Sequence, residues 1–194
     1  MPHASLGGTQ TMGRGGKDIH NIYKGECNLN RAVAYLIRRF IFHSNRKPRH
    51  CKGVTTCITE VDKEIAMKIK ELSGQPEPGL LVIDREKDPD KEEALEKFIE
   101  KHNCQLLNKH KRGYVEYYKC TPNLHLITLK GPPEDTLKEI DPDLRKHLSD
   151  PKNFDEFKKK AFKAVKNGDC DEGSSKICKG VKAIYRIVAD TIKS

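Results

Sequence analysis

The chain of 194 residues lacks the segments that mark a membrane protein or a secretory leader. No window comes near the roughly 20 consecutive apolar residues that a membrane-spanning helix requires. The longest apolar stretch in the first half, Ala32 to Phe42, is interrupted by Arg38 and Arg39. Residues 1–16 contain no apolar region of the kind found in secretory signals. These absences predict a chain without a membrane segment, although a mature secreted protein would look the same after its signal had been cleaved.

The sequence also lacks the motifs of a structural zinc site. Seven cysteines are present, but none form a C-x-x-C motif, and the eight histidines show no ligand spacing. Six of the cysteines fall into three pairs along the chain, which leaves Cys27 over (Cys51 and Cys57, Cys104 and Cys120, Cys170 and Cys178). If these pairs are disulfides, the compartment is oxidising. The odd count and the missing signal favour a reduced, cytoplasmic protein, and a secreted protein is the alternative.

No catalytic signature stands out either. Gly13-Arg-Gly-Gly16 is not a phosphate loop, because no strand precedes it and no Gly-Lys-Ser/Thr follows. Arg38 and His43 have the R-x4-H spacing of some metal-independent ribonucleases, but a basic helix gives this spacing by chance. Three aspartates that follow a predicted strand are better explained as an acidic helix start than as metal ligands (Asp84, Asp88 and Asp90). Since no nucleophile, base and orienting partner can be named together, the sequence favours a binding protein over an enzyme and predicts neither a cofactor nor a metal.

The chain is basic, with a formal net charge of +9, and the charge is unevenly spread. Between Lys24 and Lys52 there are eight basic residues and a single acidic residue, Glu26. A second basic cluster surrounds Glu116 (Lys109, Lys111, Arg112 and Lys119). This asymmetry favours an anionic partner such as a nucleotide, a nucleic acid or a phosphorylated surface. The alternative is a solvated basic face that keeps the protein soluble.

The first half of the chain predicts an arm and two helices. Residues 1–20 are rich in glycine and poor in apolar residues, which predicts a flexible N-terminal arm before a single domain, 21–194. Apolar residues at i, i+3 and i+4 predict a long amphipathic first helix over roughly 28–43, with Asn28 as its N-cap. Thr59 and Asp62 resemble a capping box, so a second helix is expected to begin there and to end at Gly74.

The rest of the chain predicts strands followed by helices. In chain order we expect a buried strand at Leu80–Ile83, a helix opened by Asp88-Pro89, a hairpin from Cys104–Leu107 to Tyr114–Lys119, a short strand from Leu124, a helix opened by Asp150-Pro151 and a last helix from Ile177. The order α-α-β-α-β-β-β-α-α predicts an α/β (α+β) fold. Its centre is a short-stranded mixed sheet with helices packed around it.

The predicted hairpin is the most informative candidate site. Its turn and following strand combine basic and aromatic residues (Lys109, Lys111, Arg112, Tyr114, Tyr117 and Tyr118). Guanidinium groups bond phosphate bidentately and tyrosines stack on bases, so this combination suits a nucleotide. The alternative is an ordinary exposed hairpin whose tyrosines reflect β-propensity.

Several segments resemble the ligand-binding domain of the STING family. They are Gln105-Leu-Leu-Asn-Lys-His-Lys-Arg112, Tyr114-Val-Glu-Tyr117, and Thr121-Pro122 with Leu124 and Leu126. Lys24-Gly25 followed by Asn28-Leu-Asn-Arg-Ala32 is similar to the start of that family's dimer helix. The resemblance implies a homodimeric sensor of innate immunity that binds a cyclic dinucleotide between its first helices, without catalysis.

The resemblance also implies a set of ligand-binding residues. Arg112 would contact phosphate, Glu116 and Thr121 would contact the base or ribose, and an aromatic residue of the first helix would stack on a base. The full predicted set is Arg112, Tyr114, Glu116, Thr121, Pro122, Tyr35, Arg39 and His43. Two other functions stay open: a nucleic-acid-binding module that uses the Lys24–Lys52 face, and a disulfide-stabilised secreted effector.

Overall fold

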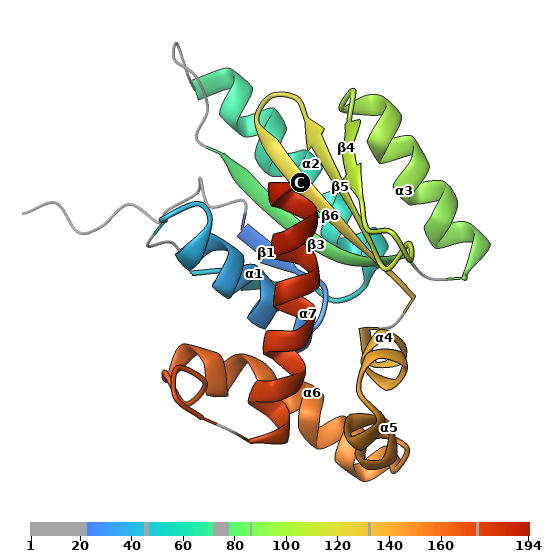
Figure 1. Cartoon of the computed structure of the whole chain (residues 1–194). Helices are drawn as coiled ribbons and strands as arrows, with labels where there is room; N and C mark the ends of the chain where they lie inside the picture. Colours follow the sequence, from blue (N-terminus) through green and yellow to red (C-terminus); the bar gives the residue numbers. More distant parts are fainter. Residues whose placement is uncertain (1–22, 45–46, 72–77, 86, 132, 174) are drawn as a thin grey trace, which may run out of the picture.

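A computed structural model describes most of the chain, namely residues 23–44, 47–71, 78–85, 87–131, 133–173 and 175–194. The predicted arm, 1–20, and the predicted helix end at Gly74 lie outside these residues. In the described part, seven helices surround one six-stranded mixed sheet, which confirms the α/β fold class (Figure 1). None of the described helices is both long and apolar enough to cross a membrane.

The sheet combines a parallel half with an antiparallel hairpin. Its strands are β1 (Tyr23–Gly25), β2 (Arg49–His50), β3 (Gly79–Arg85), β4 (Gln105–Lys109), β5 (Val115–Cys120) and β6 (Leu124–Lys130), in the spatial order β2-β1-β3-β6-β5-β4. β2, β1, β3 and β6 are parallel to one another, whereas β5 is antiparallel to both of its neighbours. The carboxyl ends of β1, β3 and β6 therefore lie at one edge of the sheet, beside the start of β5.

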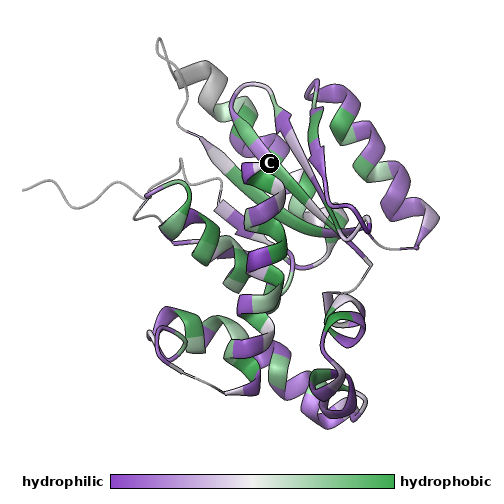
Figure 2. Ribbon diagram, viewed as in Figure 1, coloured by the Kyte–Doolittle hydropathy of each residue, from purple (hydrophilic) through white to green (hydrophobic). Residues whose placement is uncertain are grey.

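Helices cover both faces of the sheet. They are α1 (Asn28–Phe40), α2 (Val54–Glu71), α3 (Pro89–Lys101), α4 (Pro133–Ile140), α5 (Pro142–Leu148), α6 (Pro151–Lys166) and α7 (Lys176–Lys193). α1 and α4 to α7 share one hydrophobic core with one face of the sheet, and α2 and α3 share another core with the opposite face. Hydrophobic residues accordingly gather on the strands, while α3 is mainly hydrophilic (Figure 2).

Strand alternation explains why one sheet supplies two cores. On β3, Leu80 and Val82 face α1, whereas Leu81 and Ile83 face α2 and α3. All four side chains are fully buried. A continuous apolar run is typical of a parallel strand that is covered on both faces, and this is the pattern from which the strand was predicted.

Local signals located several helix starts correctly. Asp88 and Asp150 cap α3 and α6 by accepting hydrogen bonds from backbone N–H groups two residues ahead, and each is followed by proline. The capping box at Thr59 was wrong, because α2 already begins at Val54. The Thr59 hydroxyl instead donates to the Thr55 carbonyl inside the helix, at 2.9 Å.

The prediction missed four elements. β1 and β2 have three and two residues, too few to show an alternating pattern. The segment between the first and the second predicted helix thus contains β2 and the start of α2. α4 and α5 were also missed, although Asp141 caps α5 ahead of a proline in the same way as Asp88 and Asp150. Their eight and seven residues are too short for a clear helical period.

The chain order creates a topological switch point between β1 and β3. α1 connects β1 to β2, which lies on one side of β1. α2 then connects β2 to β3, which lies on the other side of β1. α1 and α2 lie on opposite faces of the sheet. In open sheets of this kind, ligands bind outside the carboxyl ends of the strands at such a point, which directs attention to this edge.

Candidate functional site

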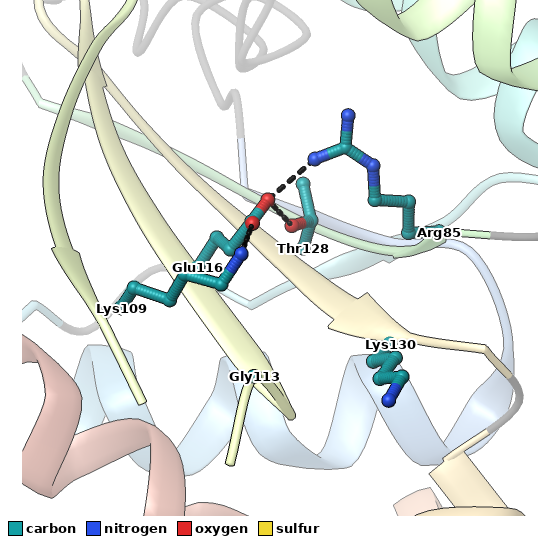
Figure 3. Close-up of a pocket in the computed structure, with 6 residues that line it drawn as sticks. All are labelled: Arg85, Lys109, Gly113, Glu116, Thr128 and Lys130. Atoms are coloured by element: carbon teal, nitrogen blue, oxygen red, sulfur yellow. Dashed lines mark hydrogen bonds and ion pairs between the residues drawn. The ribbon is translucent and has the colours of Figure 1, made fainter. Parts of the chain in front are cut away.

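The carboxyl edge of β3 and β6 is hollowed on the side of α3. A cavity of about 410 Å³ is lined by Arg85, Lys109, Gly113, Glu116, Thr128 and Lys130 (Figure 3). A second cavity of about 690 Å³ shares Arg85 and Lys130 with the first and extends to α3 and α4, where its lining includes Lys87, Glu92, Asp135 and Glu139. We call the two together the β3–β6 cleft. Each volume falls in the usual range for a small-molecule site.

Arg85, the last residue of β3, forms ion pairs with residues of α3 and β5. Its Nε donates to Glu92 at 2.6 Å and its Nη1 donates to Glu116 at 2.5 Å, while Nη2 pairs with Glu96. Burial alone would lower the pKa of Arg85, but the hydrogen bond to Glu92 and the charge of Glu116 raise it above its ordinary value. Arg85 therefore stays charged, and it lines both cavities of the cleft.

Glu116 is the half-buried carboxylate at the centre of the cleft. One oxygen accepts from Arg85 and from the Tyr118 hydroxyl at 2.8 Å, and the other accepts from Lys109 at 2.7 Å. Burial disfavours the charged form, yet the hydrogen bonds from Lys109 and Tyr118 and the charge of Arg85 outweigh it, so the pKa of Glu116 is lowered. In Figure 3 the Glu116 side chain points toward Thr128, whose hydroxyl is 3.4 Å away.

Four exposed cations around the cleft pair with no carboxylate among the described residues (Lys87, Lys111, Arg112 and Lys130). Lys130 lines both cavities, and in Figure 3 its side chain points away from the Arg85–Glu116 cluster. Lys111 and Arg112 lie on the turn between β4 and β5. An anion in the cleft would thus meet cations whose charge is not already neutralised by a partner.

The structure brings only part of the predicted ligand-binding set to this cleft. Glu116 and Tyr114 line it, and Arg112 lies on the adjacent turn. Thr121 and Pro122 follow the opposite end of β5, where the Thr121 hydroxyl donates to the His102 carbonyl at 2.7 Å.

The three predicted residues of the first helix also lie away from the cleft. The Tyr35 ring packs edge-on against Phe162 of α6, with the centroids 6.2 Å apart. Arg39 pairs with Asp171 at 3.4 Å, and His43 is exposed beyond the end of α1. These side chains belong to the α1–α6 side of the molecule, so within one chain they do not form a single pocket with Glu116.

The three tyrosines on and just before β5 are core residues and do not offer open stacking faces. Tyr114, Tyr117 and Tyr118 are all buried. The Tyr114 hydroxyl donates to Glu139 at 2.6 Å, and the Tyr117 hydroxyl lies 2.7 Å from His125. At the cleft, Tyr114 lines the second cavity and Tyr118 donates its hydroxyl to Glu116, whereas the Tyr117 hydroxyl lies toward the other end of the strand, beside His125.

The Lys24–Lys52 stretch presents less charge to solvent than its composition indicates. Lys24 is 2% exposed and pairs with Glu60 and Glu64, at 2.6 and 2.9 Å. Arg38 is 4% exposed and lies over the Tyr35 ring. The basic face predicted from this stretch is therefore smaller than the count of basic residues.

Six cysteines are close enough to form three disulfides, Cys51–Cys57, Cys104–Cys120 and Cys170–Cys178, and these are the pairs anticipated from the sequence. Cys27 is free. Burial, followed by the charge of Asp84, raises the pKa of the Cys27 thiol to about 12, which leaves it protonated and poorly reactive.

No protein-family model, no curated protein and no solved structure matches the chain. The resemblance to the STING ligand-binding domain therefore rests on the sequence segments quoted above. Among the cleft residues that the sequence did not single out are Arg85 and Lys130. Their only local signal was a charged residue at the end of an apolar run, which marks the carboxyl end of a buried strand.

Proposed function

We propose that this protein is a non-enzymatic domain that binds an anionic nucleotide in the β3–β6 cleft. The observation that carries the proposal is Lys130, which lines both cavities and has no carboxylate partner among the described residues. Lys87 lines the second cavity, and Arg112 projects from the adjacent turn. Such groups attract phosphate, and Arg112 is able to hold it bidentately.

The acidic residues of the cleft favour a small nucleotide over a nucleic acid. Glu92, Asp135 and Glu139 line the second cavity and would repel a polyanion that ran through it. A nucleotide carries one compact anionic group, and its base and ribose supply hydrogen-bond donors that these carboxylates accept. The hydroxyl of Thr128 offers a further polar contact at the floor.

A cyclic dinucleotide is the more specific version of the proposal, and it requires a homodimer. In this version, Arg112 from the hairpin contacts phosphate, and the α1 residues of a second copy complete the site. The Arg112→Ala variant should then lose cyclic dinucleotide binding without unfolding. A monomer that binds mononucleotides as well as cyclic dinucleotides would retain the nucleotide proposal and exclude the dimeric version.

The test uses thermal unfolding and calorimetric titration with AMP, ATP, cyclic di-GMP and inorganic phosphate. Reversing the charge in Lys130→Glu should weaken nucleotide binding at least tenfold. Lys159→Glu makes the same charge change on the exposed surface of α6 and should leave binding unchanged. Equal losses in both variants, or no binding of any nucleotide by the wild type, would contradict the proposal.

The compartment follows from the redox state of the cysteines and is also a proposal. A cytoplasmic location goes with reduced thiols and a secreted one with three disulfides, and close cysteine pairs fit both. Counting free thiols in the denatured natural protein separates the two. One free thiol favours an oxidising compartment, and seven favour the cytoplasm.

A further inference from the structure

A separate cavity lies among the helices, below the sheet in the view of Figure 1. It has a volume of about 460 Å³, which is in the usual range for a small-molecule site. Residues of α5, of the first turn of α6 and of the first turn of α7 form its walls (Asp141, Asp143, Leu144, Lys146, His147, Asn153, Lys176 and Lys179). None of them lines the β3–β6 cleft. We call this second location the α5–α7 cavity.

Contacts between the three helices hold the walls of the cavity in place. The side-chain amide of Asn153 donates to the carbonyl of His147 at 3.2 Å, which joins the start of α6 to the end of α5. α7 packs closely on α6, because a Cβ on Gly180 would lie 2.7 Å from the Phe157 ring. The side chains of these first turns are therefore presented to the cavity by helices that contact each other directly.

Three lysines on the wall of the cavity form no ion pair. Lys146, Lys176 and Lys179 are exposed, and none of them pairs with a carboxylate in the part of the chain that the structure describes. Lys176 is also the first residue of α7, a helix of 18 residues, so the positive end of the helix dipole adds to the charge of the lysines. This side of the cavity therefore favours a compact anion such as phosphate.

The opposite side of the cavity offers acceptors for hydroxyl groups. Asp141 caps α5, because its Oδ1 accepts from the backbone N–H groups of Asp143 and Leu144 at 3.0 and 3.1 Å. The exposed Asp143 carboxylate forms no ion pair with the described residues. Asn153 donates through its amide nitrogen, which leaves its amide oxygen as an acceptor for a ligand. A ligand that carries hydroxyl groups beside a phosphate would use both sides of the cavity.

The lining also restricts the rest of the ligand. Leu144 is the one apolar residue among the eight that line the cavity, and no Phe, Tyr or Trp side chain is among them. A ligand with a large apolar part would bury little apolar surface here and would gain little free energy from it. A ligand that is polar throughout can instead satisfy the charged and amide groups of the wall.

We propose that the α5–α7 cavity binds the phosphate monoester of a small polyol, that is, a ligand of the sugar phosphate class. Lys146, Lys176 and Lys179 hold the phosphate, and the oxygens of Asp143 and Asn153 accept hydrogen bonds from the hydroxyl groups of the polyol. The site shares no residue with the β3–β6 cleft, so it does not depend on the proposed nucleotide binding.

Calorimetric titration of the full chain with glucose 6-phosphate and with inorganic phosphate, at matched ionic strength, tests the proposal. The wild type should bind glucose 6-phosphate saturably and inorganic phosphate more weakly. Lys179→Glu should weaken the binding of glucose 6-phosphate at least tenfold. This variant should fold, because the helix dipole favours a carboxylate in the first turn of α7. Lys159→Glu makes the same charge change on the exposed surface of α6 and should bind as the wild type does.

Two further variants separate the parts of the proposal. Asp143→Ala removes a hydroxyl acceptor and a negative charge, so it should bind inorganic phosphate more tightly while its preference for glucose 6-phosphate over phosphate falls at least threefold. Lys176→Gln replaces Lys179→Glu if that variant does not fold, and it should weaken the binding of both ligands. The proposal is overturned if the wild type does not bind glucose 6-phosphate saturably, if the folded lysine variants bind it as tightly as the wild type, or if the preference is unchanged in Asp143→Ala. It is also overturned if Lys130→Glu, in the β3–β6 cleft, weakens this binding as much as Lys179→Glu does.

Discussion

Acidification from pH 7 to pH 4 should destabilise the protein through one histidine, His125 on β6. Its Nδ1 lies 2.7 Å from the Tyr117 hydroxyl and its Nε2 lies 2.9 Å from the Lys119 ammonium. The Phe42 ring packs on it with the centroids 4.4 Å apart. Burial, followed by the charge of Lys119, lowers the pKa of His125 to about 4. Because the ammonium donates to Nε2, the folded protein requires the neutral ring.

The sign and size of the effect follow from the two pKa values. In the unfolded chain His125 has an ordinary pKa of about 6.5, so the unfolded state takes up a proton first as the pH falls. The stabilisation by the neutral ring is thus fully present above about pH 6.5 and is lost as the pH falls toward about 4. At 1.36 kcal/mol per pKa unit the upper limit is about 3.4 kcal/mol, and partial exposure of the ring reduces it to about 2–3 kcal/mol.

Urea unfolding at several pH values between 7 and 4 measures the effect. The His125→Gln variant has no titrating ring, so its free energy of unfolding should fall less with acidification than that of the wild type, by about 2–3 kcal/mol. Other groups titrate below about pH 5, so the difference between variants is the quantity to compare. His147→Gln on α5 is the matched control, because it makes the same substitution away from Tyr117 and Lys119. An NMR titration that gave His125 a pKa above 6, or equal slopes in His125→Gln and the wild type, would refute the reasoning.

Three further substitutions test the charge cluster of Glu116 and the close packing at two glycines. Glu116→Gln should cost about 1–3 kcal/mol, because it leaves cations of a half-buried cluster without their counter-charge. It should also reduce the loss of stability as the pH falls below the ordinary carboxyl pKa, since the lowered pKa of Glu116 contributes stability only above that range. Gly25→Ala should cost about 3 kcal/mol or more, because the new Cβ would lie 2.3 Å from the Arg31 backbone nitrogen. Gly180→Ala should cost less, because its Cβ meets the tip of the Phe157 ring at 2.7 Å, and alanine favours the helix by about 1 kcal/mol. Urea unfolding measures all three, and a Gly180→Ala loss as large as that of Gly25→Ala would contradict the packing argument.

The sequence predicted those elements whose signals are local. The Asp-Pro starts of α3 and α6 and the apolar run of β3 depend on neighbouring residues alone, and all three were confirmed. β1 could not be found this way, because a strand of three residues is defined by its partners. Its pairing with β3 joins positions more than fifty residues apart, such as Tyr23 and Leu80. Information of this kind comes from tertiary packing and not from periodicity.

The same distinction between local signals and tertiary pairing applies to the residues of the candidate site. The hairpin turn with Arg112 was found because basic and aromatic residues adjoin there in sequence. Arg85 and Lys130 end two different strands, and only the parallel pairing of β3 with β6 aligns them as register partners. Charge counting overestimated the Lys24–Lys52 face, because composition does not reveal that Lys24 is buried against α2.

The last two residues of β3, Asp84 and Arg85, carry opposite charges. Strand alternation sends Asp84 toward α1 and Arg85 toward α3, so the two side chains lie on opposite faces of one strand. A nucleic acid laid along this edge would meet the carboxylates of Glu92, Asp135 and Glu139 as well as the exposed cations, so it would gain few favourable phosphate contacts. A single nucleotide in the cleft would instead place its phosphate near Lys130 and its base or ribose near these carboxylates, so the mixed charge of the cleft suits it better.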